Sequence, residues 1–354
     1  MRNRKLKINV IIPFVTETGG IKVIFSYCDY LVKQGHDVVC YMPYIQYKFN
    51  NTNILRIRSM IGDILNHRLK PSTKHLFEYK LVLRIHNHYI RDADLTIATA
   101  WPTARDVNKL DLSKGKKVYF IQSYEIWSSR SITEVEDTYK YEMSKICVST
   151  ELHDILKNKY GSESYILLNG VNENEFINKN KETKKSVLTM YSYQPCKQSE
   201  MGLEILKKIK AIDKNIEINI FGIKKPQNID SSFNFYENPT RDKILQLYQN
   251  SSIYLYTSNQ NESWGLPVLE AMANKCVVIG NCSGCVKEIG VNMENLVITD
   301  GNVESFVKHI LLVLNDNVLM KKIQNNAFKT ANSLKMNKQY KKMENIIYEI
   351  IEKG

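Results

Sequence analysis

The sequence of 354 residues has no long apolar run. Since no stretch of about 18 or more apolar residues occurs, we expect no transmembrane helix. Basic residues 1–7 lead into an apolar run that ends at Pro13, which is too short for a signal peptide. Low-complexity tracts are also missing, and 43% of the residues are hydrophobic, as in globular proteins. We therefore expect a cytoplasmic protein, and the length favours two domains over one.

Patterns that bind metals or carry redox chemistry are scarce. The seven cysteines are scattered, and only Cys282 and Cys285 have C-x-x-C spacing, without the second pair of ligands that a zinc site needs. Asp92 and Asp94 form a D-x-D pair, but Asp94 leads directly into an apolar run. The histidines form no ligand-like cluster beyond residues 86–88, which favour a polar surface. The sequence predicts no bound metal and no cofactor.

Positive charge is unevenly distributed. The net charge is +12, and residues 45–91 hold nine Lys or Arg against two carboxylates, a local net charge of +7. Such a surface attracts nucleic acid, anionic lipid head groups or a phosphate-bearing substrate. A solvated basic surface without a partner is the alternative.

Strand and helix patterns alternate in the first half of the chain. Residues 7–14 and 36–43 have the pattern of buried strands, and residues 21–34 have helical apolar spacing. We expect a turn at Gly19 and Gly20, before this helix. Strand, helix and strand in this order form a βαβ unit, which requires a parallel sheet. Further strands are expected at 93–100, 117–122, 145–149 and 164–168.

The second half repeats the pattern, beginning with a strand at 186–191. Later strands are expected at 216–222, 253–256 and 277–280, and helices at 202–210, 241–249 and 268–273. Polar, turn-rich residues 169–185 are interpreted as a linker. The sequence therefore predicts an α/β protein with two doubly wound, Rossmann-like domains, 1–168 and 186–335, followed by a helical segment in 336–354.

Two carboxylates stand eight positions apart in Glu262-Ser-Trp-Gly-Leu-Pro-Val-Leu-Glu270. Glu262 lies in a loop with Gly and Pro, and we expect Glu270 at the start of a helical segment rich in Ala and Met. Carboxylates accept hydrogen bonds from hydroxyls, and helix N-termini attract phosphate. The stretch suits a ligand with hydroxyls and phosphates; two solvated glutamates in an ordinary loop and helix start are the alternative.

This stretch resembles the Glu-x7-Glu motif of the retaining glycosyltransferases of family 4, which have the GT-B fold. Residues 265–267 and the Ala-Met-Ala run at 271–273 match the family as well, whereas Ser263 stands where glycine is common. The resemblance implies that two Rossmann-like domains face each other across a cleft and that the second binds the donor. It also implies that the helix in 336–354 packs back on the first domain.

The resemblance assigns roles to residues of the second domain. Glu270 is expected to bind ribose hydroxyls, Glu262 the hydroxyls of the donor sugar, and Lys197 the diphosphate, although a plain surface charge is the alternative for Lys197. The family's arginine near Ser192 is missing, and the sequence does not place another cation, such as Arg241 or Lys224, in its stead. The other expected donor-binding residues are Ser192, Gly222, Ser263, Trp264, Gly265, Leu266 and Pro267, with Gly19 and Gly20 of the first domain.

Residues 121–127 end a predicted strand of the first domain, where α/β sheets place ligands. The sequence of this segment is similar to that of a subset of bacterial-polysaccharide glycosyltransferases that includes rhamnosyltransferase-like members. Gln122 is expected among the catalytic residues, with Glu262 and Lys197. Glu125, Trp101 and Trp127 are expected on the acceptor side, and core packing is the alternative for both tryptophans.

The expected reaction is metal-independent, retaining transfer of a sugar from a UDP-sugar, or a dTDP-deoxysugar such as rhamnose, to a hydroxyl of a glycan or lipid-linked glycan. Residues 45–91 favour peripheral contact with an anionic membrane at its inner face, and no nucleic-acid partner is expected. Two alternatives stay open. One is a sugar-nucleotide epimerase or a phosphorylase of similar fold, and the other is a non-catalytic nucleotide-sugar binder.

Overall fold

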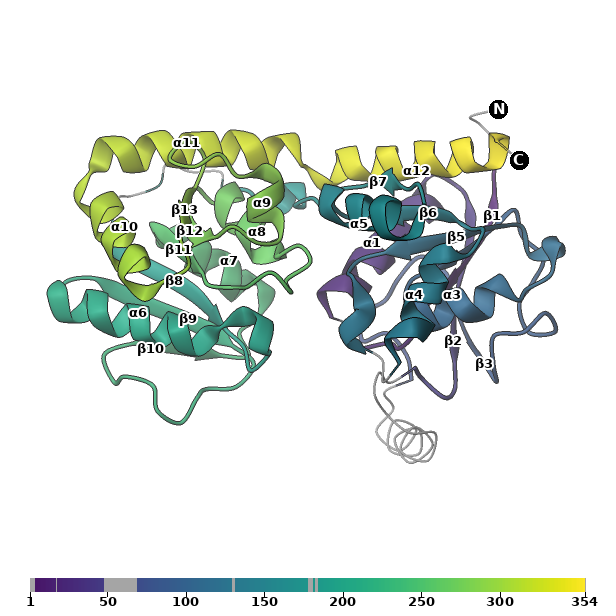
Figure 1. Cartoon of the computed structure of the whole chain (residues 1–354), viewed down its shortest axis with the longest axis horizontal. Helices are drawn as coiled ribbons and strands as arrows, with labels where there is room; N and C mark the ends of the chain where they lie inside the picture. The colour runs from purple at the N-terminus through teal and green to yellow at the C-terminus, as the bar shows by residue number, and fades with distance from the viewer. Residues whose placement is uncertain are drawn as a thin grey trace. The chain divides into compact units, whose positions relative to one another are not determined.

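The structure is a computed structural model that describes residues 4–16, 18–47, 69–128, 131–177, 181 and 184–353. The chain divides into two compact units, Met1–Leu168 with Gln339–Gly354, and Asn169–Lys338 (Figure 1). Each unit contains one sheet in which every paired strand is parallel. Two Rossmann-like α/β units, as the sequence predicts, are thus confirmed.

The first unit is built on a seven-stranded sheet in the order β3-β2-β1-β4-β5-β6-β7. Central strand β1 pairs with β2 and β4, and all but its first residue are buried. Burial on both faces explains why Ile8, Val10 and Ile11 are apolar, while the buried Asn9 donates from Nδ2 to the carbonyl of Arg91 at 3.0 Å. The strands are β1 (Lys7–Ile11), β2 (Asp37–Pro43), β3 (Glu78–Val82), β4 (Leu95–Ala98), β5 (Lys116–Ile121), β6 (Ser144–Cys147) and β7 (Tyr165–Ile166).

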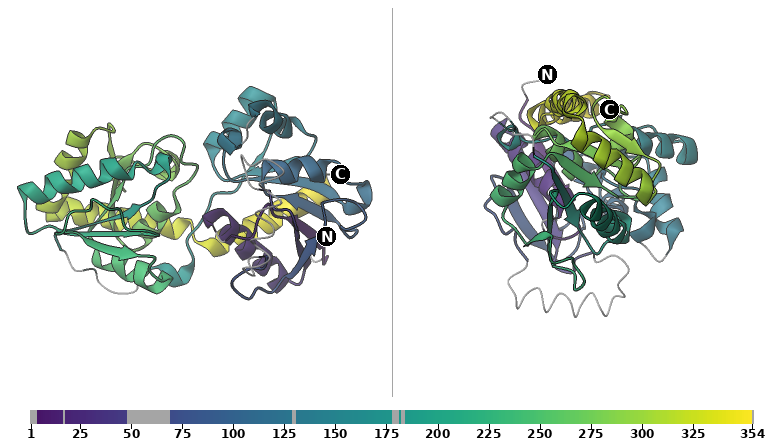
Figure 2. Two further views of the ribbon diagram at one scale, coloured as in Figure 1. Left: turned by 90° about the horizontal axis from the view of Figure 1, so that it is seen from below. Right: turned by 90° about the vertical axis from the view of Figure 1, so that its left-hand side faces the viewer.

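Helices lie on both sides of this sheet (Figure 2). They are α1 (Gly19–Lys33), α3 (Trp101–Asn108), α4 (Ile132–Lys140), α5 (Thr150–Tyr160) and α12 (Met336–Glu352), with 3₁₀ turns η1 (Leu112–Lys114) and η2 (Glu125–Ser128). The C-terminal helix α12 contacts α1, because Tyr30 Oη donates to Glu344 at 2.9 Å and the ring of Tyr340 stacks on Tyr30 at 4.9 Å. This contact ties the end of the chain to the first unit.

The second unit has a six-stranded sheet in the order β10-β9-β8-β11-β12-β13. Its strands are β8 (Ser186–Tyr191), β9 (Glu217–Gly222), β10 (Asn234–Glu237), β11 (Ile253–Tyr256), β12 (Val277–Asn281) and β13 (Val297–Thr299). Its helices are α6 (Ser199–Ile212), α7 (Arg241–Asn250), α8 (Leu266–Ala273), α9 (Cys285–Ile289), α10 (Val303–Asn315) and α11 (Asn317–Ser333), with 3₁₀ turns η3 (Glu173–Glu175) and η4 (Pro195–Lys197).

Strand order reverses at β8 in the second unit, because the chain continues from β8 to β9 on one side and returns to β11 on the other. Such a switch point opens a crevice at the carboxyl ends of the strands, which is where α/β sheets bind ligands. On one face of the sheet, buried residues of α6 and α10, such as Leu206 and Phe306, pack on alternate strand residues such as Val187 and Ile220. This core fixes the strand ends that carry the candidate site.

The segment interpreted as a linker, 169–185, belongs to the second unit, which begins at Asn169. Val171 forms a bridge with Lys335, and the amide of Ile177 donates to the carbonyl of Ala273 at 3.2 Å. These contacts hold the backbone at Val171 and at Ile177.

Two further expectations concern membranes. In the part of the chain that the structure describes, no helix combines the length and apolar character needed to cross a bilayer. Of the basic region 45–91, residues 48–68 lie outside the described residues. The described remainder includes the edge strand β3, which the sequence did not predict.

Candidate active site

The stretch from Glu262 to Glu270 forms a loop and most of helix α8. Gly265 caps the helix in a left-handed conformation with φ +81°, and Pro267 follows in its first turn, where proline fits because it needs no amide partner. Helix α8 therefore starts at Leu266, and Glu270 lies in its middle. The expectation that Glu270 opens the helix is wrong, so its charge is not placed to stabilise the helix N-terminus.

Lys197 and Glu262 form an ion pair between side chains that are each 14% exposed. Lys197 ends η4, just after β8, and Glu262 lies in the loop between β11 and α8. The two loops are tied together, since Thr257 Oγ1 donates to the carbonyl of Lys197 at 2.8 Å and the amide of Asn259 donates to that of Cys196 at 2.8 Å. The structure thus brings together two residues that the sequence predicted as catalytic.

A small depression lies next to this pair, at the switch point between β8 and β11. It is lined by Thr189, Met190, Lys197, Tyr254, Leu255, Tyr256, Thr257, Ser258 and Pro267. A lysine and the first turn of a helix therefore meet at the edge of the sheet where a crevice is expected. Lys197 and Pro267 are the two predicted site residues that line it.

Glu270 is held from two sides by residues that the sequence did not assign to the site. Arg241 Nη2 donates to Oε1 at 2.8 Å, and Tyr248 Oη donates to Oε2 at 3.1 Å. Arg241 also pairs with Glu175. The sequence named Arg241 only as a cation of unknown position. No motif and no regular spacing links residues 175, 241 and 270, so their contact could not be predicted.

Other predicted donor-binding residues have local structural roles. Gly222 leaves room for a close approach of backbones, since a Cβ there would lie 2.6 Å from the carbonyl oxygen of Tyr191. Ser192 shapes the turn after β8: its hydroxyl accepts from the amide of Gln194 at 3.2 Å. Trp264 is buried, and its carbonyl accepts from the amide of Cys285 at 2.6 Å. Ser263 and Leu266 are half-buried beside the motif glutamates.

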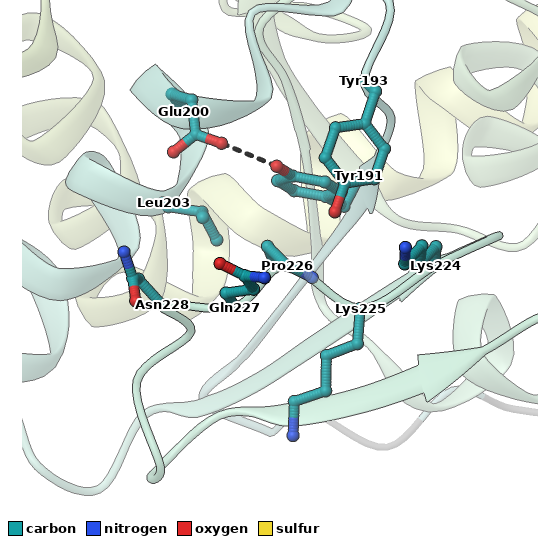
Figure 3. Close-up of a pocket in the computed structure, with 9 residues that line it drawn as sticks. All are labelled: Tyr191, Tyr193, Glu200, Leu203, Lys224, Lys225, Pro226, Gln227 and Asn228. Carbon is teal, nitrogen blue, oxygen red and sulfur yellow. Dashed lines mark hydrogen bonds between the residues drawn. The ribbon is translucent and has the colours of Figure 1, made fainter.

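A second cavity of about 580 Å³ lies at the end of β8, where Tyr191 lines it (Figure 3). Tyr191 Oη donates to Glu200 at 2.6 Å. Glu200, Lys224 and Lys225 also line this cavity, and the Lys225 side chain extends away from both tyrosines (Figure 3). The remaining lining residues are Tyr193, Leu203, Pro226, Gln227 and Asn228.

In the first unit, Gly20 and Gln122 come together at the carboxyl edge of the sheet. Helix α1 begins at Gly19, with Thr18 as its cap. The expectation of a turn at Gly19 and Gly20 is therefore wrong, because both glycines form the first turn of the helix. A Cβ on Gly20 would lie 3.2 Å from Gln122 Oε1, so the glycine lets the amide approach the helix start.

Glu125 holds a hydrogen-bonded cluster beneath this edge. Its Oε2 accepts from Tyr119 Oη and from the amide of Trp101, each at 2.8 Å, and its own amide donates to Tyr139 Oη at 2.9 Å. Burial raises the pKa of Glu125 to about 7, although the hydrogen bonds from Tyr119 and from the amide of Trp101 oppose the shift. Trp101 is buried in the core, and the side chain of Trp127 lies outside the described residues. Their acceptor-side roles stay predictions.

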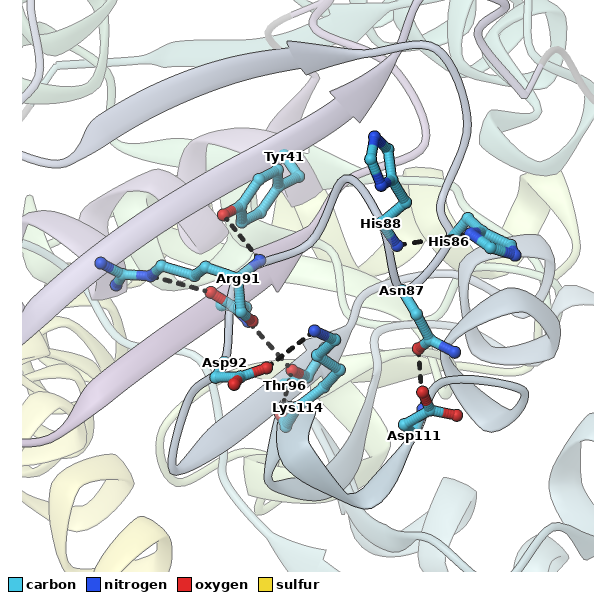
Figure 4. A network of polar contacts seen from close by, with 10 residues as sticks. Tyr41, His86, Asn87, His88, Arg91, Asp92, Thr96, Asp111 and Lys114 are labelled. Atoms are coloured by element: carbon cyan, nitrogen blue, oxygen red, sulfur yellow. Dashed lines mark hydrogen bonds and ion pairs between the residues drawn. The ribbon is translucent and has the colours of Figure 1, made fainter.

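The acidic and histidine patterns of the first unit take part in a structural network (Figure 4). Asp92 pairs with Lys114 at 2.7 Å, which lowers the pKa of Asp92, and Asp94 accepts from the amide of Lys7 at 2.8 Å. The amide of His88 donates to His86 Nδ1 at 3.3 Å. Within the described ranges, no group of three or more His, Cys, Asp or Glu residues is placed to hold a metal ion.

Comparison with known proteins gives a family for the second unit. Residues 171–330 match the model of the family described as Glycosyl transferases group 1. No curated protein sequence matches the chain significantly.

Several solved structures are similar over nearly the whole chain. Sucrose-phosphate synthase from Thermosynechococcus elongatus has a TM-score of 0.73 at 11% identity and covers 99% of this chain and 100% of its own. A glycosyltransferase from Rickettsia africae has a TM-score of 0.70 at 16% identity, with 99% and 100% covered. HepE from Anabaena, solved with UDP and glucose, has a TM-score of 0.71 at 13% identity, with 97% and 100% covered.

At these identities the structural similarity establishes the fold, and the family match supplies the enzyme class. The matched residues include β8, the Lys197 turn, the motif loop and α8, which are the elements that build the ion pair and hold Glu270. The chain therefore has the GT-B fold, its second unit contains a glycosyl transferases group 1 domain, and the protein is a glycosyltransferase.

Proposed function

We propose that the protein transfers a sugar from a nucleoside-diphosphate sugar to a hydroxyl of a glycan or lipid-linked glycan, with retention of configuration and without a metal ion. The observation that carries this proposal is the Lys197–Glu262 ion pair at the switch point of the second sheet. A cation for the diphosphate and a carboxylate for the sugar hydroxyls stand side by side, inside the domain that matches the glycosyltransferase family.

The chemistry follows from the charges that develop. Breaking the bond between the sugar C1 and the diphosphate oxygen puts negative charge on the leaving group and positive character on the ring. Lys197 stabilises the diphosphate, and Glu262 accepts hydrogen bonds from the sugar hydroxyls. The acceptor oxygen attacks C1 from the face that the diphosphate leaves, and the leaving phosphate oxygen takes the acceptor proton. This sequence of events retains the configuration at C1.

A ligand bound to one of the structurally similar proteins favours one class of donor for this protein. HepE, which shares the fold, was solved with UDP and glucose, and this supports a UDP-sugar as donor. The expectation of a dTDP-deoxysugar rested on the sequence similarity of the segment around Gln122. This segment lies in the first unit, outside the domain that matches the family. We therefore place UDP-sugars first in the assay.

We expect UDP to raise the unfolding temperature and UDP-sugars to support transfer to a glycan acceptor. At a nucleotide concentration of 100 times Kd, binding adds about 2.7 kcal/mol to the stability of the folded protein. Calorimetry measures the first effect, and mass spectrometry of acceptor and released UDP, with NMR of the anomeric proton, measures the second.

The same assay separates the alternatives. An epimerase changes the free nucleotide sugar when no acceptor is present, and a phosphorylase requires inorganic phosphate. A non-catalytic binder shows the thermal shift without any product. If no nucleoside diphosphate or nucleotide sugar shifts the unfolding temperature, the proposed function is wrong.

We also propose that the first unit contacts anionic membranes through the described part of residues 45–91. Lys70, Lys74 and Arg84 are exposed there, together with Leu76 and Leu83, which are 55% and 60% exposed. Exposed leucines beside lysines suit a surface that has both charge and an apolar boundary.

The protein is expected to sediment with phosphatidylserine vesicles at low salt, since each basic residue near such a surface contributes about 1 kcal/mol. Replacing Lys70, Lys74 and Arg84 together by alanine should weaken binding by roughly 100-fold. Phosphatidylcholine vesicles are the control. Equal sedimentation with both lipids, or no effect of salt, would contradict the proposal.

A further inference from the structure

Arg241 joins two carboxylates that come from distant parts of the second unit. Its Nη2 lies 2.7 Å from Glu175 Oε1 and 2.8 Å from Glu270 Oε1, and its Nε donates to Glu175 Oε1 at 2.9 Å. Glu175 ends η3, Arg241 opens α7, and Glu270 lies in the middle of α8. One guanidinium is thus shared by two carboxylates, whose oxygens are close because both contact the same nitrogen.

The backbone supports the same arrangement. Asn274 Nδ2 donates to the carbonyl of Glu175 at 3.0 Å and to that of Glu270 at 2.8 Å. Asn274 is completely buried. The segment that carries Glu175 is therefore fixed to the end of α8, although the Arg241 side chain itself is 41% exposed.

Glu270 keeps free hydrogen-bonding capacity in this arrangement. A carboxylate offers about four acceptor positions, two on each oxygen. Arg241 takes one on Oε1, and the buried Tyr248 takes one on Oε2. One position on each oxygen is left, and the side chain is 16% exposed. Two neighbouring acceptors held in a fixed plane match two adjacent hydroxyls, as in a cis-diol.

We propose that Arg241, anchored by Glu175, is a positioning residue that holds the Glu270 carboxylate oriented toward the ribose cis-diol of the donor, so that the site prefers ribonucleotides over deoxyribonucleotides. This inference rests on the proposed function and on the expectation, from the family resemblance, that Glu270 binds the ribose hydroxyls of the donor. Arg241 acts through Glu270. Two of its nitrogen atoms already bind carboxylates, so it does not take the place of the missing arginine near Ser192.

Charge explains why Glu270 needs this partner. Burial raises the pKa of Glu175, the charge of Arg241 counteracts that rise, and Glu270 adds to it. Without Arg241, two partly buried carboxylates would face each other with no cation between them. Repulsion between the two carboxylates would then favour their separation, and Glu270 would lose the orientation that Arg241 gives it.

The experiment measures dissociation constants by calorimetry for the pairs UDP and 2′-deoxy-UDP, and GDP and 2′-deoxy-GDP, with the full chain. We expect the wild type to bind the ribonucleotide of the recognised base at least about tenfold more tightly than its deoxy form. In Arg241→Ala this ratio should fall to within about threefold, and ribonucleotide affinity should fall about tenfold or more. Adding Glu175→Gln to Arg241→Ala should recover part of the affinity, since it removes the stranded charge.

Two further variants separate positioning from general damage. Arg241→Lys should give an intermediate ratio, because one ammonium group cannot reproduce the fixed fork of Nε and Nη2. Lys243→Ala, on the same helix, removes a cation that lies over the ring of Tyr236 at 4.8 Å, and it should leave the ratio unchanged. If Arg241→Ala fails to fold, Arg241→Lys and the double variant carry the test.

Each outcome decides between the two proposals. A wild type that binds a nucleoside diphosphate and its deoxy form equally overturns the positioning role and leaves the proposed function standing. A variant at Arg241 that keeps the wild-type ratio also overturns it, even if both affinities fall together, since general damage weakens both nucleotides alike. If the wild type binds neither member of either pair, and no other nucleoside diphosphate or nucleotide sugar shifts its unfolding temperature, the proposed function fails as well.

Discussion

Replacing Glu262 with alanine is expected to lower the turnover number of sugar transfer by about 100-fold or more, while the Kd of the free nucleotide changes by less than about threefold. Glu262 faces the sugar, which a free nucleotide lacks, and its interaction with the ring matters most as positive character develops there. Glu270→Ala is expected to act in the opposite way, with a weaker nucleotide Kd and a smaller change in turnover. Steady-state kinetics and nucleotide calorimetry on both variants measure the difference.

The ion pair adds a test that does not depend on the assigned roles. Lys197 and Glu262 are in contact and each is largely buried, so the effects of Lys197→Ala and Glu262→Ala on turnover should not add in the double variant. Glu294→Ala is the matched control, because Glu294 belongs to the same unit and pairs with Lys322 at an exposed position. Additive effects, or a Glu262→Ala variant whose main defect is nucleotide affinity, would contradict the division between the two glutamates.

Sequence patterns predicted the elements that are long, apolar and covered on both faces. The bounds of β8 and β11 agree with the prediction, and α12 begins where the helical segment was expected, because apolar periodicity is a local signal. The edge strands β3 and β10 were missed. Each has partly exposed, mixed residues, Glu-Tyr-Lys-Leu-Val and Asn-Phe-Tyr-Glu, so neither has the apolar run of a central strand.

The candidate site was predicted only in part, for a similar reason. A motif names residues that are close in sequence, so it located Glu262 and Glu270, and the family resemblance added Lys197. Tyr248 and Arg241, which bind Glu270, lie 22 and 29 positions before it in the sequence. Glu175, which binds Arg241, lies 95 positions before Glu270. Only the packing of α7, α8 and η3 brings them together. Trp264 was expected to bind the donor because it lies within the motif, but its side chain is buried. Membership of a motif therefore does not show that a side chain is accessible to a ligand.

The last prediction concerns the backbone that shapes the motif loop. Gly265→Ala is expected to lower the free energy of unfolding of the second unit by about 2–4 kcal/mol. Gly265 has φ +81°, and a Cβ there would lie 2.8 Å from Tyr256 Oη and 3.2 Å from two ring carbons. The left-handed conformation costs an alanine about 1–2 kcal/mol. Tyr256 is 4% exposed, so its ring cannot swing into solvent to make room.

Urea unfolding of the Gly265→Ala and Gly301→Ala variants separates the cost of the left-handed conformation from the cost of the steric contact with Tyr256. Gly301 is left-handed too, with φ +88°, but a Cβ there would meet only the side-chain oxygen of Asn281, at 3.3 Å. Gly301→Ala should therefore lose only about 1–2 kcal/mol, the conformational part. Tyr256→Phe removes the oxygen closest to the new Cβ, so it should cost less stability in the Gly265→Ala background than in the wild type. Equal losses for the two glycine variants would show that the close approach to Tyr256 does not constrain the loop, and that Gly265 serves only to turn the chain into α8.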